Sequence, residues 1–211
     1  MIARLAYKNT INLEKNNMKN NHKGKRLFIT GIPTSGKTYL AKKISNEIDA
    51  IVVHLDNLRA DLSKDSKYKT FTNFYLDKNE EEYLTKTSPE QIWNDLVWQS
   101  ENLWPAFEKE INRYKDEEKP VVFECVNLLP HIAQKYLDFD GVVLIGDSYQ
   151  NTLERNKKEP RWGATEDLQK LEAESFFNVE RPRYKAEAEK NGYPVFETAD
   201  EAFEYCLNLL Q

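Results

Sequence analysis

From position 31 the sequence reads Gly31-Ile32-Pro33-Thr34-Ser35-Gly36-Lys37-Thr38, preceded by the apolar run Leu27-Phe28-Ile29 and by Thr30. The residues that follow have the spacing of a helix, so the predicted order is strand, glycine-bearing loop, helix. In that context the stretch fits the phosphate-binding pattern G-x-x-x-x-G-K-[ST]. Backbone N–H groups of such a loop meet anionic oxygens at the positive end of a helix. The sequence therefore predicts a polyphosphate site at the start of this helix.

The positions of this motif have separate expected roles. Gly31 and Gly36 lack a Cβ atom, which lets the backbone turn tightly and approach the phosphates. Lys37 is expected to reach the β- and γ-phosphates, and the Thr38 hydroxyl to ligate Mg²⁺. At this motif the chain resembles the P-loop NTPases, which implies ATP and Mg²⁺ as ligands. The residues expected to bind the nucleotide are Gly31, Pro33, Thr34, Ser35, Gly36, Lys37, Thr38 and Tyr39.

Apolar runs and helical patterns alternate along the rest of the chain. This alternation is typical of a parallel sheet covered by helices on both faces. The predicted fold is therefore α/β, with three α/β/α layers around a mostly parallel five-stranded sheet, as in P-loop NTPases. Strands are expected at residues 26–30, 51–55, 120–124, 142–145 and 194–198.

The charge, cysteine content and apolar runs of the chain indicate which classes of protein it can belong to. The 211 residues have a net charge of −5, which does not favour broad electrostatic binding to nucleic acid. The two cysteines, Cys125 and Cys206, suit reduced thiols in a cytoplasmic protein. No apolar run approaches the roughly 20 residues of a membrane span. We therefore expect a cytoplasmic protein without a membrane partner; the sequence leaves its oligomeric state open.

Acidic residues end two of the expected strands. Asp56 follows the strand at residues 51–55, at the sheet edge where open α/β sheets bind ligands. It can take the proton of an acceptor hydroxyl, and Arg59, one helical turn later, can bind an anionic acceptor. Glu124 can contact the acceptor and orient Mg²⁺ through water. The structural alternatives are a helix N-cap for Asp56 and an ordinary strand-end acid for Glu124.

Two short segments resemble known kinases. Asp56-x-x-Arg59 resembles the pattern of P-loop kinases that act on hydroxyl groups, such as polynucleotide and gluconate kinases. Residues 123–130 resemble an E-G-V-H-L-x-P segment of the 2-phosphoglycerate kinase group, with Cys125 in place of Gly and Asn127 in place of His. These departures leave the acceptor open.

The order of the motifs along residues 26–210 resembles the small P-loop kinases of the nucleoside monophosphate kinase-like class. In that class a lid brings arginines over the phosphates, where they neutralise charge on the transferred group. The resemblance implies a lid segment at residues 157–165, with Arg155 and Arg161 as catalytic residues. The alternative for this segment is a solvated charged loop.

The domain organisation follows from these motifs. Residues 1–25 are polar and rich in Asn and Lys, so we expect a disordered extension, with Met18 as an alternative start. Residues 26–211 are expected to form one kinase-like domain. Residues 63–87 are polar and aromatic, and are expected to form an acceptor-side insertion. Alternatively, they form a surface subdomain whose aromatic rings pack only on one another.

Three further expectations concern packing. His54 is interpreted as a core residue with satisfied hydrogen bonds. Ser88 and Gln91 are expected to form a capping box at the start of a long helix. The tryptophans of that helix are expected to lie in the core: Trp93, Trp98 and Trp104.

The leading hypothesis is a kinase that uses ATP and Mg²⁺ to phosphorylate a hydroxyl of a small, anionic metabolite. Its catalytic residues would be Asp56, Lys37, Arg155 and Arg161. A second hypothesis is a kinase of nucleotides, nucleic-acid ends or sugar nucleotides, the last resembling zeta toxins. A third, of another class, is a nucleotide-regulated binding module with slow ATP hydrolysis.

Overall fold

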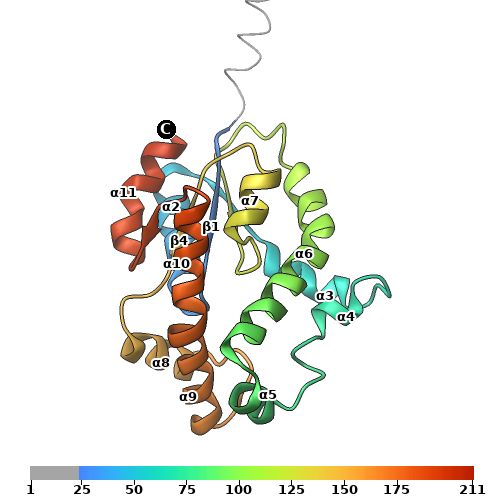
Figure 1. Ribbon diagram of the computed structural model, residues 1–211. Coiled ribbons are helices and arrows are strands. Elements are labelled where there is room, and N and C mark those ends of the chain that lie inside the picture. The colour runs from blue at the N-terminus through green and yellow to red at the C-terminus, as the bar shows by residue number, and fades with distance from the viewer. Residues whose placement is uncertain (1–23) are drawn as a thin grey trace, which may run out of the picture.

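The structure, a computed structural model, describes residues 24–211 and contains a sheet with helices on both faces (Figure 1). All but two residues of the expected N-terminal extension lie outside the described residues. The strands are β1 (Arg26–Gly31), β2 (Ile51–His54), β3 (Val121–Glu124), β4 (Gly141–Leu144) and β5 (Val195–Phe196). The helices are α2 (Lys37–Ile48), α3 (Arg59–Leu62), α4 (Lys69–Thr72), α5 (Glu80–Lys86), α6 (Pro89–Asn112), α7 (Pro130–Tyr136), α8 (Tyr149–Lys158), α9 (Glu166–Glu174), α10 (Arg181–Lys190) and α11 (Ala199–Leu210), with a 3₁₀-helix η1 (Leu55–Leu58) and a π-helix η2 (Ser175–Glu180).

The five strands pair in the order β2-β3-β1-β4-β5, and every neighbouring pair is parallel. The predicted five-stranded parallel sheet is therefore confirmed. The central strand is β1, with β3 on one side and β4 on the other. The chain order reverses at this strand, and such switch points are where open α/β sheets bind ligands.

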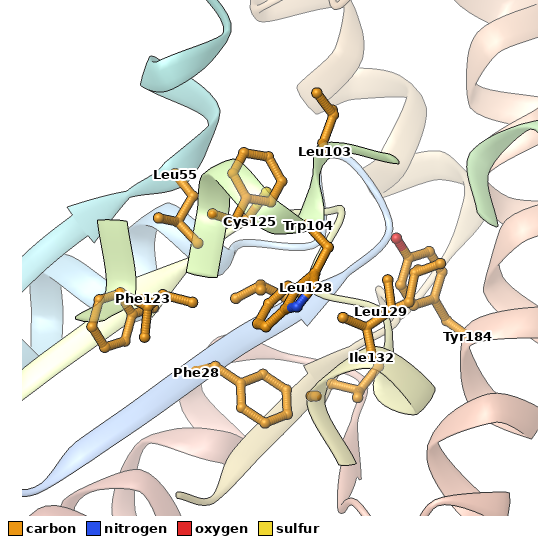
Figure 2. Packing of buried hydrophobic residues seen from close by; sticks show 14 of the residues in the cluster. Phe28, Leu55, Leu103, Trp104, Phe123, Cys125, Leu128, Leu129, Ile132 and Tyr184 are labelled. Carbon is orange, nitrogen blue, oxygen red and sulfur yellow. The ribbon is translucent and has the colours of Figure 1, made fainter. Parts of the chain in front are cut away.

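The two faces of β1 enter two apolar clusters because alternate side chains of a strand point to opposite faces. Leu27 and Ile29 pack with residues of α2 and α11. Phe28 packs with residues of α6, α7 and α10. Figure 2 shows this second cluster, in which Cys125 lies among apolar side chains. Burial raises the pKa of its thiol, so Cys125 is an unreactive packing residue.

The long helix α6 begins at Ser88, whose side chain accepts a hydrogen bond from the Gln91 backbone N–H. The expected capping box is wrong, because the Gln91 side chain donates to Asp95 instead. Trp93 and Trp104 are buried, as predicted. Trp98 is 38% exposed and is not a core residue.

The C-terminal half is less regular than the rest of the fold. The fifth strand, expected at residues 194–198, pairs only over Val195–Phe196. Pro182 lies in the first turn of α10, where proline is tolerated, so it does not interrupt that helix. Directly before α10 the chain forms the six-residue π-helix η2. Within the described part of the chain, none of the helices combines the length and apolar character that crossing a membrane requires.

Candidate active site

The carboxyl edge of the sheet opens into a pocket of about 1500 Å³. Its wall joins the glycine-bearing loop, the acidic strand ends, the insertion at residues 63–87 and the lid segment. This volume exceeds the roughly 300–1,000 Å³ of a site for one small ligand, so the pocket has room for two. The predicted site residues that line it are Pro33, Thr34, Ser35, Gly36, Lys37, Thr38, Tyr39, Asp56, Arg59, Glu124, Arg155 and Arg161.

Gly31 is the predicted site residue that does not line the pocket. A Cβ atom at this position would lie 1.8 Å from the carbonyl oxygen of Leu144 on β4. The neighbouring strand therefore requires glycine at this position, and the role of Gly31 in nucleotide binding stays a prediction. Gly36 has a φ of 98°, a left-handed conformation that favours glycine, and it caps α2.

The start of α2 fits an anion. No side chain caps this helix end and its first turn holds no acidic residue, which leaves backbone N–H groups for a ligand. The Lys37 ammonium donates to the Ile32 carbonyl oxygen at 2.6 Å. Burial lowers the pKa of Lys37, and the nearby Glu124 and Asp56 carboxylates oppose that shift. A bound polyphosphate would add the negative charge that holds Lys37 protonated.

Thr34 lies in the loop with a φ of 63°, a conformation that is strained for a β-branched residue. Its backbone carbonyl accepts a hydrogen bond of 3.1 Å from Arg155 on α8. Its side-chain Oγ1 is buried and has no hydrogen-bond partner among the described residues. An orphaned hydroxyl beside the anion-binding helix end fits a phosphate oxygen as its missing partner.

Glu124 and Thr38 meet at the end of β3. The Thr38 hydroxyl donates to Glu124 Oε2 at 3.3 Å, and His54 Nδ1 lies 2.7 Å from the same oxygen. A hydroxyl and a carboxylate are ligands that Mg²⁺ takes together with phosphate oxygens, so this pair fits the ion. Among residues 24–211, no three His, Cys, Asp or Glu side chains gather around a metal position. The interpretation of His54 as a core residue is wrong, because it lines the pocket and contacts Glu124.

Asp56 follows β2 in the short helix η1 and lies beside Arg59. Arg59 Nε donates to Asp56 Oδ1 at 3.2 Å, as the three-residue spacing predicts. The Cys125 sulfur lies 3.3 Å from the same oxygen. Asp56 makes no side-chain cap hydrogen bond to η1, because the N-cap position of this short helix is His54. Its carboxylate thus remains available to the pocket.

A buried polar cluster fixes Arg59 from behind. The Asn127 carbonyl oxygen accepts from Arg59 Nη2, and the Gln99 oxygen accepts from the same nitrogen at 3.3 Å. Asn127 is fully buried and also donates to Ser100 at 2.7 Å. Asn127, which stands where the resembling segment has His, therefore supports Arg59 and does not line the pocket.

The lid segment connects α8 to α9. Arg161 lines the pocket, pairs with Glu159 at 3.5 Å, and its charge lowers the pKa of Lys37. Trp162 packs against the insertion, with ring centroids 5.8 Å from Tyr75 and 6.0 Å from Tyr83. The lid and the insertion are thus in contact across the pocket.

The insertion folds as short helices, including α4 and α5, around an aromatic cluster. Its rings contact one another and also Trp98 of α6: Phe71, Phe74, Tyr75 and Tyr83. Tyr75 and Tyr83 line the pocket as well. Rings that pack on one another thus also line the pocket, and an acceptor-side role for this segment stays a prediction.

Arg181 and Arg183 form a basic group that the sequence leaves unassigned. Arg181 pairs with Glu197 at 2.7 Å and donates to the Gly146 carbonyl oxygen. The neighbouring Tyr184 is fully buried and donates to the Val126 carbonyl oxygen at 2.6 Å. Arg181 and Tyr184 thus have structural partners outside the pocket wall.

Sequence reasoning missed Glu180, at the end of η2. It lines the pocket and is 9% exposed. Burial raises the pKa of its carboxyl to about 7, while the Lys37 ammonium opposes the shift. A π-helix has no sequence signature, and Glu180 is one of many acidic residues in this region, so no local signal marks it.

Comparisons with solved structures agree with the fold. A shikimate kinase from Acinetobacter baumannii in complex with shikimate is 13% identical, with a TM-score of 0.50, covering 90% of this chain and 95% of that chain. TT1252 from Thermus thermophilus is 15% identical, with a TM-score of 0.50, covering 90% and 99%. A deoxyadenosine kinase from M. mycoides with bound dATP is 15% identical, with a TM-score of 0.46, covering 87% and 97%.

A comparison of the sequence with family models identifies a family. The model of the family described as Nephrocystin 3, N-terminal matches residues 12–145, more than half of the chain. No curated protein matches the sequence at a significant level. The chain is thus a P-loop NTPase that has the fold of small kinases.

Proposed function

The chain belongs to the family described as Nephrocystin 3, N-terminal, and from its kinase-like fold we propose that it is an ATP-dependent phosphotransferase. Its acceptor would be a hydroxyl group of a small molecule. The supporting observation is that one pocket holds both the phosphate-binding loop and a strand-end carboxylate, Asp56, with room for two ligands. A module that only binds a nucleotide does not need the part of this pocket that lies beyond the phosphate-binding loop.

In the proposed reaction the γ-phosphoryl group leaves ADP and joins the acceptor oxygen. The bond between the γ-phosphorus and the bridging oxygen breaks, a bond from the same phosphorus to the acceptor oxygen forms, and the hydroxyl proton passes to Asp56. The products are ADP and a phosphorylated acceptor. Arg59 restrains the Asp56 carboxylate through its 3.2 Å contact, so the base is held in one orientation.

Cationic side chains would stabilise the transferred group. Lys37 and Arg161 both line the pocket, and Arg155 supports the loop through the Thr34 carbonyl oxygen. Thr38 and Glu124 would hold Mg²⁺, which would supply charge neutralisation at the phosphates. The assignment of an anionic acceptor, which rests on Arg59, stays a prediction.

The test is ADP release with and without a panel of acceptors: nucleosides, sugars, sugar nucleotides, phosphoglycerates and RNA ends. A kinase releases ADP at least tenfold faster with its acceptor, and the phosphorylated product appears in equal amount. A protein that hydrolyses ATP at one slow rate whatever is added would instead be a nucleotide-regulated module.

Asp56→Asn should lower acceptor phosphorylation by a factor of about 10² to 10⁴, the usual worth of a general base. ATP binding should remain, because Asp56 does not belong to the loop. The matched control is Asp61→Asn, an exposed carboxylate on α3 that pairs with Lys64, which should phosphorylate at the wild-type rate. Equal loss in both variants, or in neither, would remove Asp56 from the mechanism.

A further inference from the structure

Glu180 is a buried carboxylate that faces the pocket and has no protein partner. It is 9% exposed and lines the pocket, and no other group of residues 24–211 forms a hydrogen bond with it. A carboxyl group buried without a hydrogen-bond partner costs free energy, and more so when it is ionised. Its presence at a pocket wall therefore points to a partner that arrives with the ligand.

The π-helix η2 aims Glu180 into the pocket. In an α-helix, residues five apart lie about 140° apart around the axis. The wider turn of a π-helix bonds residue i to i+5 and brings such residues toward one face. Ser175 and Glu180, at the two ends of η2, both line the pocket, as does Phe176. Single π-turns are rare and are frequently found at functional sites.

The pocket that Glu180 lines also has aromatic side chains in its wall, among them Tyr75 and Tyr83. Burial raises the pKa of both phenols, and the Glu180 charge adds to the rise. The Tyr83 hydroxyl donates to Asp95 at 2.9 Å, and the Tyr75 ring packs against the Tyr83 ring with centroids 5.7 Å apart. The Tyr83 phenol therefore already has a hydrogen-bond partner within the protein. Flat rings beside a free carboxylate suit a ligand ring that carries hydrogen-bond donors.

The charge balance on this side does not favour an anion. Lys37, whose charge opposes the rise in the Glu180 pKa, belongs to the phosphate-binding loop, and the Arg59 guanidinium is held by Asp56, Gln99 and Asn127. A phosphate or carboxylate beside Glu180 would meet a like charge in a site of low dielectric. A hydroxyl or amino group would instead give the carboxylate its missing hydrogen bond.

We propose that Glu180 recognises the acceptor, and that the acceptor is an uncharged ring compound that presents hydroxyl or amino donors. Nucleosides and sugars both offer this chemistry. The inference rests on the proposed function for the identity of this ligand as the acceptor. It competes with the anionic metabolite that Arg59 suggests in the sequence, and the experiment below decides between the two.

The test is equilibrium binding by calorimetry to the full chain, with a non-hydrolysable ATP analogue present to fill the donor side. The probes are matched pairs that differ by one phosphate: adenosine, cytidine, thymidine and glucose, each against its own monophosphate. At least one uncharged probe should bind at least tenfold more tightly than its phosphate. Tighter binding of the phosphates, or no binding by any probe, overturns the proposal. Binding of a nucleoside or of glucose then shows which of the two classes of ring compound the site accepts.

Glu180→Gln keeps the side-chain shape and removes the charge. It should weaken binding of the uncharged probe about tenfold, the worth of a hydrogen bond to a charged group, and reduce the preference over the phosphate to under threefold. The matched control is Glu174→Gln, an exposed position on α9, which should keep both wild-type values. Unchanged binding in the Glu180 variant overturns the proposal. If that variant does not fold, the wild-type comparison of the pairs still decides.

Phosphorylation of the probes separates this inference from the proposed function. A protein that binds uncharged probes through Glu180 but transfers no phosphoryl group keeps the inference and is not a kinase. A protein that phosphorylates only anionic acceptors is a kinase, and the inference is wrong.

Discussion

Thr34 combines a strained backbone with an orphaned hydroxyl. Its φ of 63° places a β-branched residue in the left-handed region, and its Oγ1 is buried without a partner. Both features cost stability in the free protein. A cost at a phosphate-binding loop is understandable if the hydroxyl gains its hydrogen bond from the nucleotide.

Thr34→Val should separate the hydroxyl from the backbone strain, because valine is also β-branched. Removal of an unpaired buried hydroxyl should stabilise the free protein by about 1 kcal/mol. The affinity for ATP should fall roughly five- to tenfold with the lost hydrogen bond. Thermal melting and an ATP titration measure the two effects. A less stable variant, or one with unchanged affinity, would mean that the hydroxyl has another role.

Glu180 should make stability depend on pH. Its carboxyl has a pKa of about 7 in the folded chain against an ordinary value of 4.5, so the folded state holds the proton more tightly. Stability from this group is complete below about pH 4.5 and is lost as pH rises through about 7. Glu180→Gln should match the wild type near pH 4.5 and exceed it at pH 8 by on the order of 2–4 kcal/mol. Thermal melting across this range, with Glu174→Gln as the unaffected control, tests the sign; a variant that is less stable at pH 8 contradicts it.

At the scale of elements, the segment at residues 157–165 and the insertion at residues 63–87 meet through few groups. Trp162 contacts Tyr75 and Tyr83, and Gly163 lies against Glu80 of α5, so closely that a Cβ there would be 2.6 Å from its Oε1. Burial and the nearby Glu172 raise the pKa of Glu80 to about 7. Contacts made mainly by the Trp162 indole and the carboxyl groups of Glu80 and Glu172 can break without disturbing the sheet.

Trp162→Ala should loosen the lid while leaving the fold intact. Loss of two aromatic pairs, each worth about 0.5–1.5 kcal/mol, should raise the open population roughly tenfold. Trypsin should then cleave after Lys157, Lys158 or Arg161 about ten times faster, with little change in melting temperature. Tyr205→Ala, a partly exposed ring on α11, is the control and should leave these cleavage rates unchanged. Faster cleavage in both variants would indicate general destabilisation.

At the scale of the whole molecule, a ligand at the sheet edge should stabilise every element that borders the pocket. At 100 times its Kd, ATP adds about 2.7 kcal/mol to the free energy of unfolding. For a domain of this size that corresponds to a rise in melting temperature of about 5–11 °C. Lys37→Ala should abolish most of the rise, and Lys190→Ala, an exposed lysine on α10, should preserve it. An undiminished rise in the Lys37 variant would remove Lys37 from nucleotide binding.

Much of the fold could be predicted because it depends on local patterns. The apolar runs and the glycine-bearing loop identify strands and helices residue by residue, and their alternation specifies a parallel sheet. The strand order could not be read in this way, because β1 pairs with strands about a hundred residues later in the chain. The π-helix η2 was missed for another reason: its sequence is compatible with an ordinary helix.

The residues of the candidate site that lie at the carboxyl edge of the sheet could be predicted. Lys37, Asp56 and Glu124 line one pocket because parallel strands end at the same edge of the sheet. His54 was misread because its position, the last residue of an apolar strand, does not reveal which side faces the pocket. Glu180 reaches the site from a helix beyond the lid, through tertiary packing that no motif records.

The central position of β1 bears on how the protein is made. Arg26 pairs with Val121, and Phe28 pairs with Gly141. At 5–20 residues per second, roughly 5–20 s therefore pass between the synthesis of β1 and that of its first partner strand. During that interval the phosphate-binding loop has no sheet to hold its shape. A nascent chain should thus acquire affinity for nucleotide only late in its synthesis, after both neighbours of β1 have emerged.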